Sequence, residues 1–152
     1  MSRLWPLICV LAAIVTACGT EDTAAELERL IEETELAAEE RDTGYFRSLI
    51  SERYFDSQGN DRERMIDVIR GYFFTNQSIE VVMRVKSIAL IGAGTAEVSL
   101  LAGILSQRAG ATLLNGLDGR LYDVELEFVL DGRDWQVIGA RWERSLEAWG
   151  AD

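Results

Sequence analysis

Histidine is absent from this chain of 152 residues, and proline occurs only once, as Pro6. Without histidine there is no Ser-His-Asp or Cys-His nucleophile system, and no metal site built on imidazole ligands. The chain also has neither GxGxxG nor GxxxxGK, the glycine-rich patterns that hold nucleotide phosphates. We therefore expect no cofactor and no metal, and any catalysis would rest on carboxylates and tyrosines.

Basic residues are scarce as well, because 15 Lys and Arg stand against 26 Asp and Glu, for a net charge of −11. Nine carboxylates and a single arginine fall between residues 21 and 40. An acidic chain of this kind does not bind nucleic acid, which requires a cationic surface. The acidic run is either the solvated face of a helix or a surface for a basic partner protein.

Cysteine occurs twice, as Cys9 and Cys18, and both residues lie near a short apolar segment. Residues 4–15 carry no charge and follow the basic Arg3. A helix of that length covers about 18 Å, well short of the ~30 Å hydrocarbon core of a bilayer. The segment is therefore typical of a signal peptide, which we place at residues 1–17.

The end of this segment, Val15-Thr16-Ala17-Cys18, resembles the lipobox of bacterial lipoproteins. The resemblance implies that the Cys18 thiol is acylated, that residues 1–17 are removed, and that residues 18–23 form a tether to the membrane. Gly19 then favours the outer membrane, facing the periplasm, if the source is Gram-negative. The alternative is an ordinary secretory signal cut after Ala17.

Helical patterns occupy the first half of the remaining chain. Thr23 and Glu26 form a capping-box pattern ahead of a helix, and a short helix follows over residues 45–50. The polar cluster at 57–61 predicts a turn, with Asn60 capping a third helix that runs to about residue 73.

The periodicity changes after residue 78 from helical to alternating. Strands are predicted at 79–86, 96–104, 122–130 and 135–144, with turns at 92–94 and at Asp131-Gly132. Helices followed by an antiparallel meander define an α+β fold, because no helical crossover separates the strands. Residues 24–152 then form a single domain.

The sequence predicts three helices, the link "LISERYFDSQG" at 49–59 and a final strand beginning "WQVIG" at 135–139. This arrangement resembles the nuclear-transport-factor-2-like superfamily, also called SnoaL-like or cystatin-like. The resemblance implies a curved antiparallel sheet that wraps the N-terminal helices into a cone with one open mouth. The superfamily contains ketosteroid isomerase-like and dehydratase-like enzymes as well as non-catalytic binding and assembly domains. Fold alone therefore does not select the function.

Tyr54, Asp56 and Tyr72 are the polar residues best placed to line such a cone, at the ends of helix-type segments. A buried carboxylate and a tyrosine hydroxyl there would serve as base and hydrogen-bond donor in acid–base chemistry. The alternative is that the tyrosines are core residues with a hydrogen-bonded hydroxyl. The segment 56–61 fails the EF-hand pattern, because its glycine is fourth rather than sixth, so it is expected to be a helix-capping turn.

We expect a lipid-anchored envelope protein whose domain binds a small ligand or takes part in protein assembly, without catalysis. The alternative is an isomerase-like or dehydratase-like enzyme. An apolar concave face would suit an apolar ligand, and a cationic residue on it would suit an anionic one.

Arg141 is the fourth residue predicted to line the cone. Pairing across the Asp131-Gly132 hairpin places Trp135, Val137, Gly139 and Arg141 on the inner face of the last strand. Arg141 would then pair with an internal carboxylate such as Asp56, or with an anionic ligand.

The same alternation places Leu101, Leu105, Ile138 and Trp142 on the outer face of the sheet. That is much apolar surface for a sheet facing water, so a homodimer through this face is predicted. The alternative is cover by Leu146 and Trp149 near the C-terminus.

Overall fold

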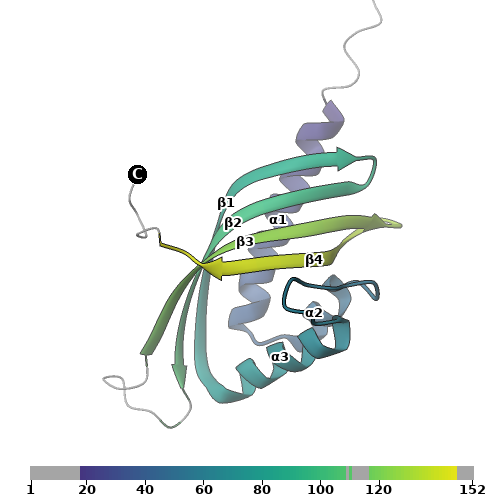
Figure 1. The fold of residues 1–152 in the computed structure, drawn as a ribbon. Helices are drawn as coiled ribbons and strands as arrows, with labels where there is room; N and C mark the ends of the chain where they lie inside the picture. Colours follow the sequence, from purple (N-terminus) through teal and green to yellow (C-terminus); the bar gives the residue numbers. More distant parts are fainter. Residues whose placement is uncertain (1–17, 109, 111–116, 147–152) are drawn as a thin grey trace, which may run out of the picture.

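The computed structural model describes the backbone of residues 18–108, 110 and 117–146. It describes the side chains of the same residues except 18–20, 117 and 118. Three helices precede four strands, as the sequence predicts (Figure 1). The helices are α1 (Cys18–Glu39), α2 (Thr43–Leu49) and α3 (Arg62–Thr75). The strands are β1 (Asn76–Gly92), β2 (Thr95–Arg108), β3 (Leu117–Asp131) and β4 (Asp134–Arg144).

Two of the helices begin at aspartates that cap them. The Asp42 carboxylate accepts hydrogen bonds from the backbone N–H groups of Gly44 and Tyr45, and Asp61 accepts one from Arg64. The cap of α3 is thus Asp61 and not its neighbour Asn60. Thr23 lies inside α1, which begins at Cys18, so the capping box predicted there does not start the helix.

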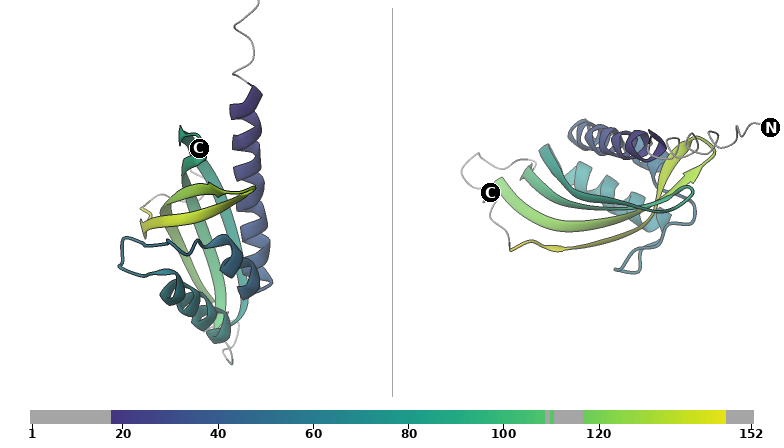
Figure 2. Two further views of the ribbon diagram at one scale, coloured as in Figure 1. Left: turned by 90° about the vertical axis from the view of Figure 1, so that its right-hand side faces the viewer. Right: turned by 90° about the horizontal axis from the view of Figure 1, so that it is seen from above.

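The four strands form an antiparallel meander in the order β1-β2-β3-β4, and the sheet curves strongly (Figure 2). Gly94 and Gly132 take positive φ angles in the two-residue turns of the β1–β2 and β3–β4 hairpins. All three helices pack on one face of this sheet, because Leu27 and Ile31 of α1, Leu49 of α2 and Ile66 of α3 share its main core cluster. The structure therefore has the predicted α+β class.

Side chains on the concave face lie in rows that the strand register defines. The rows near the two hairpin turns are aliphatic or aromatic. One row contains the buried Ala96, Phe128 and Val137, and the next places the buried Val98 beside the half-buried Leu126. A second, smaller cluster of Ala38, Ile79 and Val81 lies where α1 ends and β1 begins. The two clusters together hold the helices against the sheet.

The alternation is broken by a β-bulge in β4. Phe128 pairs with Val137, but the next pair is Glu127 with Gly139, so Ile138 has no partner in β3. From Gly139 onward every side chain of β4 therefore faces the opposite side from that which strict alternation predicts.

Both edges of the sheet are covered. The backbone N–H groups of Ser51, Phe55 and Ser57 donate to carbonyls of β4, at 3.0, 3.1 and 3.0 Å. At the other edge, Val81 and Met83 of β1 donate backbone N–H groups to carboxylates of α1, those of Glu39 and Glu35 respectively. Part of the acidic run thus blocks an edge that would otherwise be free to pair with another strand.

No helix among residues 18–108 and 117–146 is both long and apolar enough to span a membrane.

Candidate functional site

The concave face becomes more polar away from the hairpin turns. The row that contains Val85, Leu100 and Val124 ends in Trp142, and the next row places Tyr122 beside Ala102 and Met83. Tyr122 and Trp142 are both half-buried, unlike the fully buried Phe128 in a row nearer the turns. Two aromatic side chains therefore mark the point at which the closed core opens.

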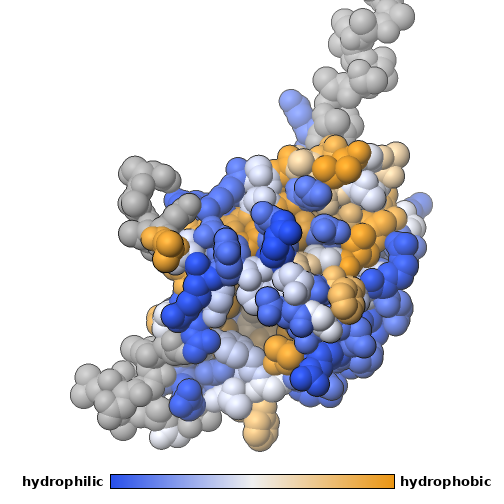
Figure 3. Space-filling model, viewed as in Figure 1, coloured by the Kyte–Doolittle hydropathy of each residue, from blue (hydrophilic) through white to orange (hydrophobic). Residues whose placement is uncertain are grey.

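Figure 3 shows the surface hollowed between β4 and α3, at this end of the sheet. Tyr72 of α3 and Ile104 of β2 are half-buried here and pack against the second core cluster. Ser106, one row further along β2, is buried beside Ile79. The hollow is thus bordered by aromatic and aliphatic side chains with hydroxyl groups at its edge, and the register adds Arg120 and Arg144 to the rows of Ile104 and Tyr122.

Among the side chains that the structure describes, no strand position on the concave face is occupied by aspartate or glutamate. The register places four acidic residues on the convex face, namely Glu97, Asp123, Glu125 and Glu127, and all but the half-buried Asp123 are exposed. A general base would have to come from elsewhere, since tyrosine and tryptophan do not serve as bases near neutral pH. The described strand positions of the hollow thus offer mainly apolar side chains and no carboxylate.

Tyr54 and Asp56 meet each other, as the sequence suggested, but they do not meet Tyr72 or Arg141. The Tyr54 hydroxyl donates to Asp56 Oδ2 at 3.1 Å, and both residues are buried in the segment beside β4. Asp56 also accepts hydrogen bonds from Gln58 N, Asn60 N and Asn60 Nδ2. The Asp56 carboxylate therefore closes the turn at 57–60.

The ionisation of this pair agrees with a structural role. Burial raises the pKa of the Asp56 carboxyl, but hydrogen bonds from Asn60, Gln58 and Tyr54 outweigh that effect and lower its pKa below the usual value. Burial, followed by the negative charge of Asp56, raises the pKa of Tyr54. Asp56 stays ionised and Tyr54 stays protonated near pH 7, and neither is poised to exchange a proton.

Arg141 does not line the cone, and the prediction that it does is wrong. The β-bulge at Ile138 turns Arg141 to the convex face, where its side chain is 69% exposed and forms an ion pair with Glu125. Neither Asp56 nor a ligand in the hollow is its partner. The same bulge brings Trp142 to the concave face, which corrects its predicted place on the outer face.

Gly139 is the one sequence signal that could have revealed this change. Its missing side chain leaves room for Glu127, whose carboxylate would lie 3.2 Å from a Cβ atom at that position. A glycine inside a strand often marks a bulge. The sequence alone does not say whether the glycine marks a bulge or only a bend, so the reversal of faces could not be inferred.

Cys18 is the first residue of α1, and the residues 18–23 expected as a tether belong to this helix. Figure 1 shows the first turns of α1 extending past the sheet. No group of three or more Cys, Asp or Glu residues in the described part of the chain could hold a metal ion.

Comparison with known proteins identifies the fold. No protein-family profile matches this chain, and no curated protein sequence is similar to it. A solved structure from Novosphingobium aromaticivorans, provisionally named a scytalone dehydratase, is 10% identical, with a TM-score of 0.73 over 84% of this chain and 89% of its own. The hexachlorocyclohexane dehydrochlorinase LinA-type3 from Novosphingobium barchaimii is 10% identical, with a TM-score of 0.69 over 85% and 90% of the two chains.

A nuclear transport factor 2-like superfamily protein from Salmonella enterica is 11% identical, with a TM-score of 0.67 over 88% of this chain and 99% of its own. The chain therefore has the nuclear-transport-factor-2-like fold that the order of its elements suggested. Solved structures with this fold include enzymes, and identities this low show the fold alone.

Proposed function

We propose that this protein is a lipid-anchored domain of the cell envelope that binds a small, mainly apolar ligand in the hollow of its concave face, without catalysing a reaction. The observation that carries the binding role is the change along the concave face from closed aliphatic rows to the half-buried Tyr122 and Trp142. Sites for small molecules are commonly concave and apolar, with a few polar groups that orient the ligand.

Absence of catalysis is supported by the absence of a described carboxylate on the concave strand positions and by the closed hydrogen-bond network of Asp56. The lipid anchor is supported by the lipobox-like Val15–Cys18 alone. An acyl group on Cys18 would hold the domain by the start of α1, and Gly19 favours the outer membrane if the source is Gram-negative.

Two neighbouring residues of β2 offer a matched test of the binding role. Ile104 faces the hollow, whereas Leu105 faces the convex side and is 41% exposed. With N-phenyl-1-naphthylamine as an uncharged fluorescent probe, we expect Ile104→Asn to weaken binding at least fivefold and Leu105→Asn to leave it unchanged. Equal effects of the two variants, or a wild-type protein that does not bind the probe, would contradict the proposal.

An acid–base enzyme is the second candidate, and the shared fold with a dehydrochlorinase and a provisional dehydratase is the observation that favours it. Such an enzyme needs a base beside the hollow. The backbone register pairs position 118, an aspartate, with the buried Ser106, and we choose Asp118 to test this alternative on that pairing alone. A dehydration or dehydrochlorination activity that disappears in Asp118→Asn, while probe binding persists, would replace the binding proposal with the enzyme.

A further inference from the structure

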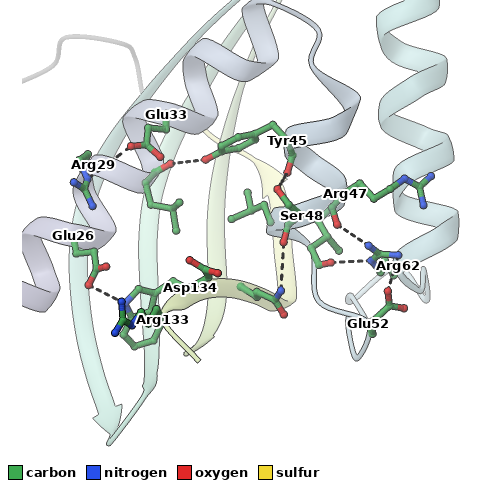
Figure 4. A pocket seen from close by; sticks show the side chains of 15 residues that line it. Glu26, Arg29, Glu33, Tyr45, Arg47, Ser48, Glu52, Arg62, Arg133 and Asp134 are labelled. Atoms are coloured by element: carbon green, nitrogen blue, oxygen red, sulfur yellow. Dashed lines mark hydrogen bonds and ion pairs between the residues drawn. The ribbon is translucent and has the colours of Figure 1, made fainter. Parts of the chain in front are cut away.

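A second cavity lies on the side of the molecule, between α1, α2 and the start of β4 (Figure 4). Its volume is about 570 Å³, which is within the range of small-molecule sites. The floor is apolar and comes from Leu30, Leu49, Ile50 and Trp135. Trp135 is the second residue of β4 and Trp142 lies seven residues later, about 20 Å along the strand, so this side pocket is separate from the concave hollow.

The charge of the side pocket differs from that of the whole chain. Its lining includes four arginines and four acidic residues and is therefore neutral, whereas the chain carries −11. An anion that approaches this acidic protein meets less repulsion here than over most of its surface.

Arg62 lies at one end of the side pocket and is held rigidly. Its Nε donates to the carbonyl of Ile50 at 2.9 Å and its Nη2 to the carbonyl of Arg47 at 2.6 Å. These two bonds fix the plane of the guanidinium, and only 15% of the side chain is exposed. A fixed guanidinium recognises a carboxylate well, because its donors are already oriented.

The remaining nitrogen of Arg62 faces carboxylates that a ligand can replace. Nη1 lies 3.0 Å from Glu52 Oε1 and 3.1 Å from Glu63 Oε1, and these two side chains are 83% and 66% exposed. Exposed carboxylates gain little from such pairs, since solvent screens them and their side chains lose freedom. Glu52 lines the pocket itself, as Figure 4 shows, and thus occupies the place that a ligand carboxylate would take.

We propose that the side pocket binds a small carboxylate with an apolar body. Its carboxylate displaces Glu52 from Arg62 Nη1, and its apolar part lies over Leu49, Ile50 and Trp135. This inference does not depend on the proposed function of the hollow, because the two sites share none of these residues.

Glu52→Gln should bind the carboxylate more tightly than the wild-type protein does. An improperly folded variant would lose binding, so it could not give this result. With 3-phenylpropionate as the probe and calorimetry as the measurement, we expect Glu52→Gln to strengthen binding at least threefold. Glu28→Gln removes the same charge from an exposed position of α1 outside the pocket and should change affinity by less than twofold. Arg62→Lys should weaken binding at least tenfold.

The uncharged 3-phenylpropionamide should bind at least tenfold more weakly than the acid, because Arg62 recognises the charge. In ¹⁵N NMR spectra, the indole N–H of Trp135 should shift on addition of the acid, and that of Trp142 should not. Equal affinities for acid and amide, no gain in Glu52→Gln over Glu28→Gln, or a shift confined to Trp142 would each overturn the proposal.

Discussion

At the scale of single residues, one carboxylate organises the link between α2 and α3. Asp56 accepts four hydrogen bonds from Gln58 and Asn60 and a fifth from the Tyr54 hydroxyl, while it remains only 3% exposed. The same residue type would suit a general base, but a base needs a pKa near the working pH. Hydrogen bonds to the ionised form instead lower the pKa of Asp56, further from neutral pH.

We predict that Asp56→Ala lowers the free energy of unfolding at pH 7 by about 1–3 kcal/mol, because buried donors lose their acceptor. The pKa of Asp56 is lowered in the folded state, so its stabilising effect is present above the unfolded value of about 3.8 and is lost as pH falls through the folded pKa. Urea unfolding at several pH values checks this.

The difference between wild type and Asp56→Ala should therefore shrink in acid. Asp67→Ala, at an exposed position of α3, is the matched control and should cost less than about 0.5 kcal/mol. A loss in Asp56→Ala that stays constant from pH 7 to pH 2 would contradict the account of its ionisation.

At the scale of elements, the contact of α1 with the edge of β1 gives two glutamates a role that composition does not reveal. Glu35 and Glu39 are four residues apart and accept hydrogen bonds from Met83 N and Val81 N, which point out of the sheet. Other acidic residues of this helix, such as Glu28 and Glu32, are exposed to solvent. The acidic run is thus partly a solvated face and partly a cover for a strand edge.

We predict that the double variant Glu35→Ala/Glu39→Ala lowers the free energy of unfolding by about 1–3 kcal/mol, through two unsatisfied backbone donors. The amide protons of Val81 and Met83 should also exchange faster with solvent.

The control is the double variant Glu28→Ala/Glu32→Ala, which has the same spacing and charge change. It should lower the free energy of unfolding by less than about 0.5 kcal/mol per site. Similar losses in the two double variants, with no change in amide exchange, would show that the carboxylates do not cover this edge.

At the scale of the whole molecule, the convex face carries a groove lined by Val82, Leu105, Leu121 and Leu146, with Gly103 and Gly119 at its base. Val82 is 52% exposed and Leu105 41%. Of the outer residues predicted for a dimer, Leu101 is fully buried and Ile138 is the unpaired residue of the bulge. Leu146 lines the groove with a fully exposed side chain, and Trp149 lies outside the described residues.

A homodimer through this groove remains our prediction. A chain from residue 19 onward should sediment as a dimer at high concentration, and Leu105→Asp should make it monomeric. Val68→Asp, which changes a 50% exposed apolar residue on α3, should leave the dimer intact. A wild-type domain that stays monomeric would contradict the interface.

Attachment to the membrane is the second prediction at this scale. Cys18→Ser should abolish acylation and leave the signal segment uncleaved by the lipoprotein peptidase, because the modified thiol is its recognition site. Cys9→Ser, within the segment that is removed, should be processed normally. Mass spectrometry that finds an unmodified mature N-terminus in the wild-type protein would exclude the anchor.

The sequence by itself determined the α+β class, the order of the elements and the inward face of most strands, because these follow from local periodicity and turn residues. The strand alternation correctly placed Val98, Phe128 and Val137 in the core. The position of Tyr54 and Asp56 at the end of a helix-type segment grouped these two residues as pocket candidates, and they do contact each other, although beside β4 and not in the hollow.

Only the tertiary structure decided which side chains β4 presents beyond Ile138. The segment at 50–57 bonds to the edge of β4, and the β-bulge places Trp142 inside and Arg141 outside. Such contacts join residues about eighty positions apart, and no local pattern in either segment encodes them. The same holds for the side pocket, whose walls come from α1, α2 and β4 and meet only when the chain has folded.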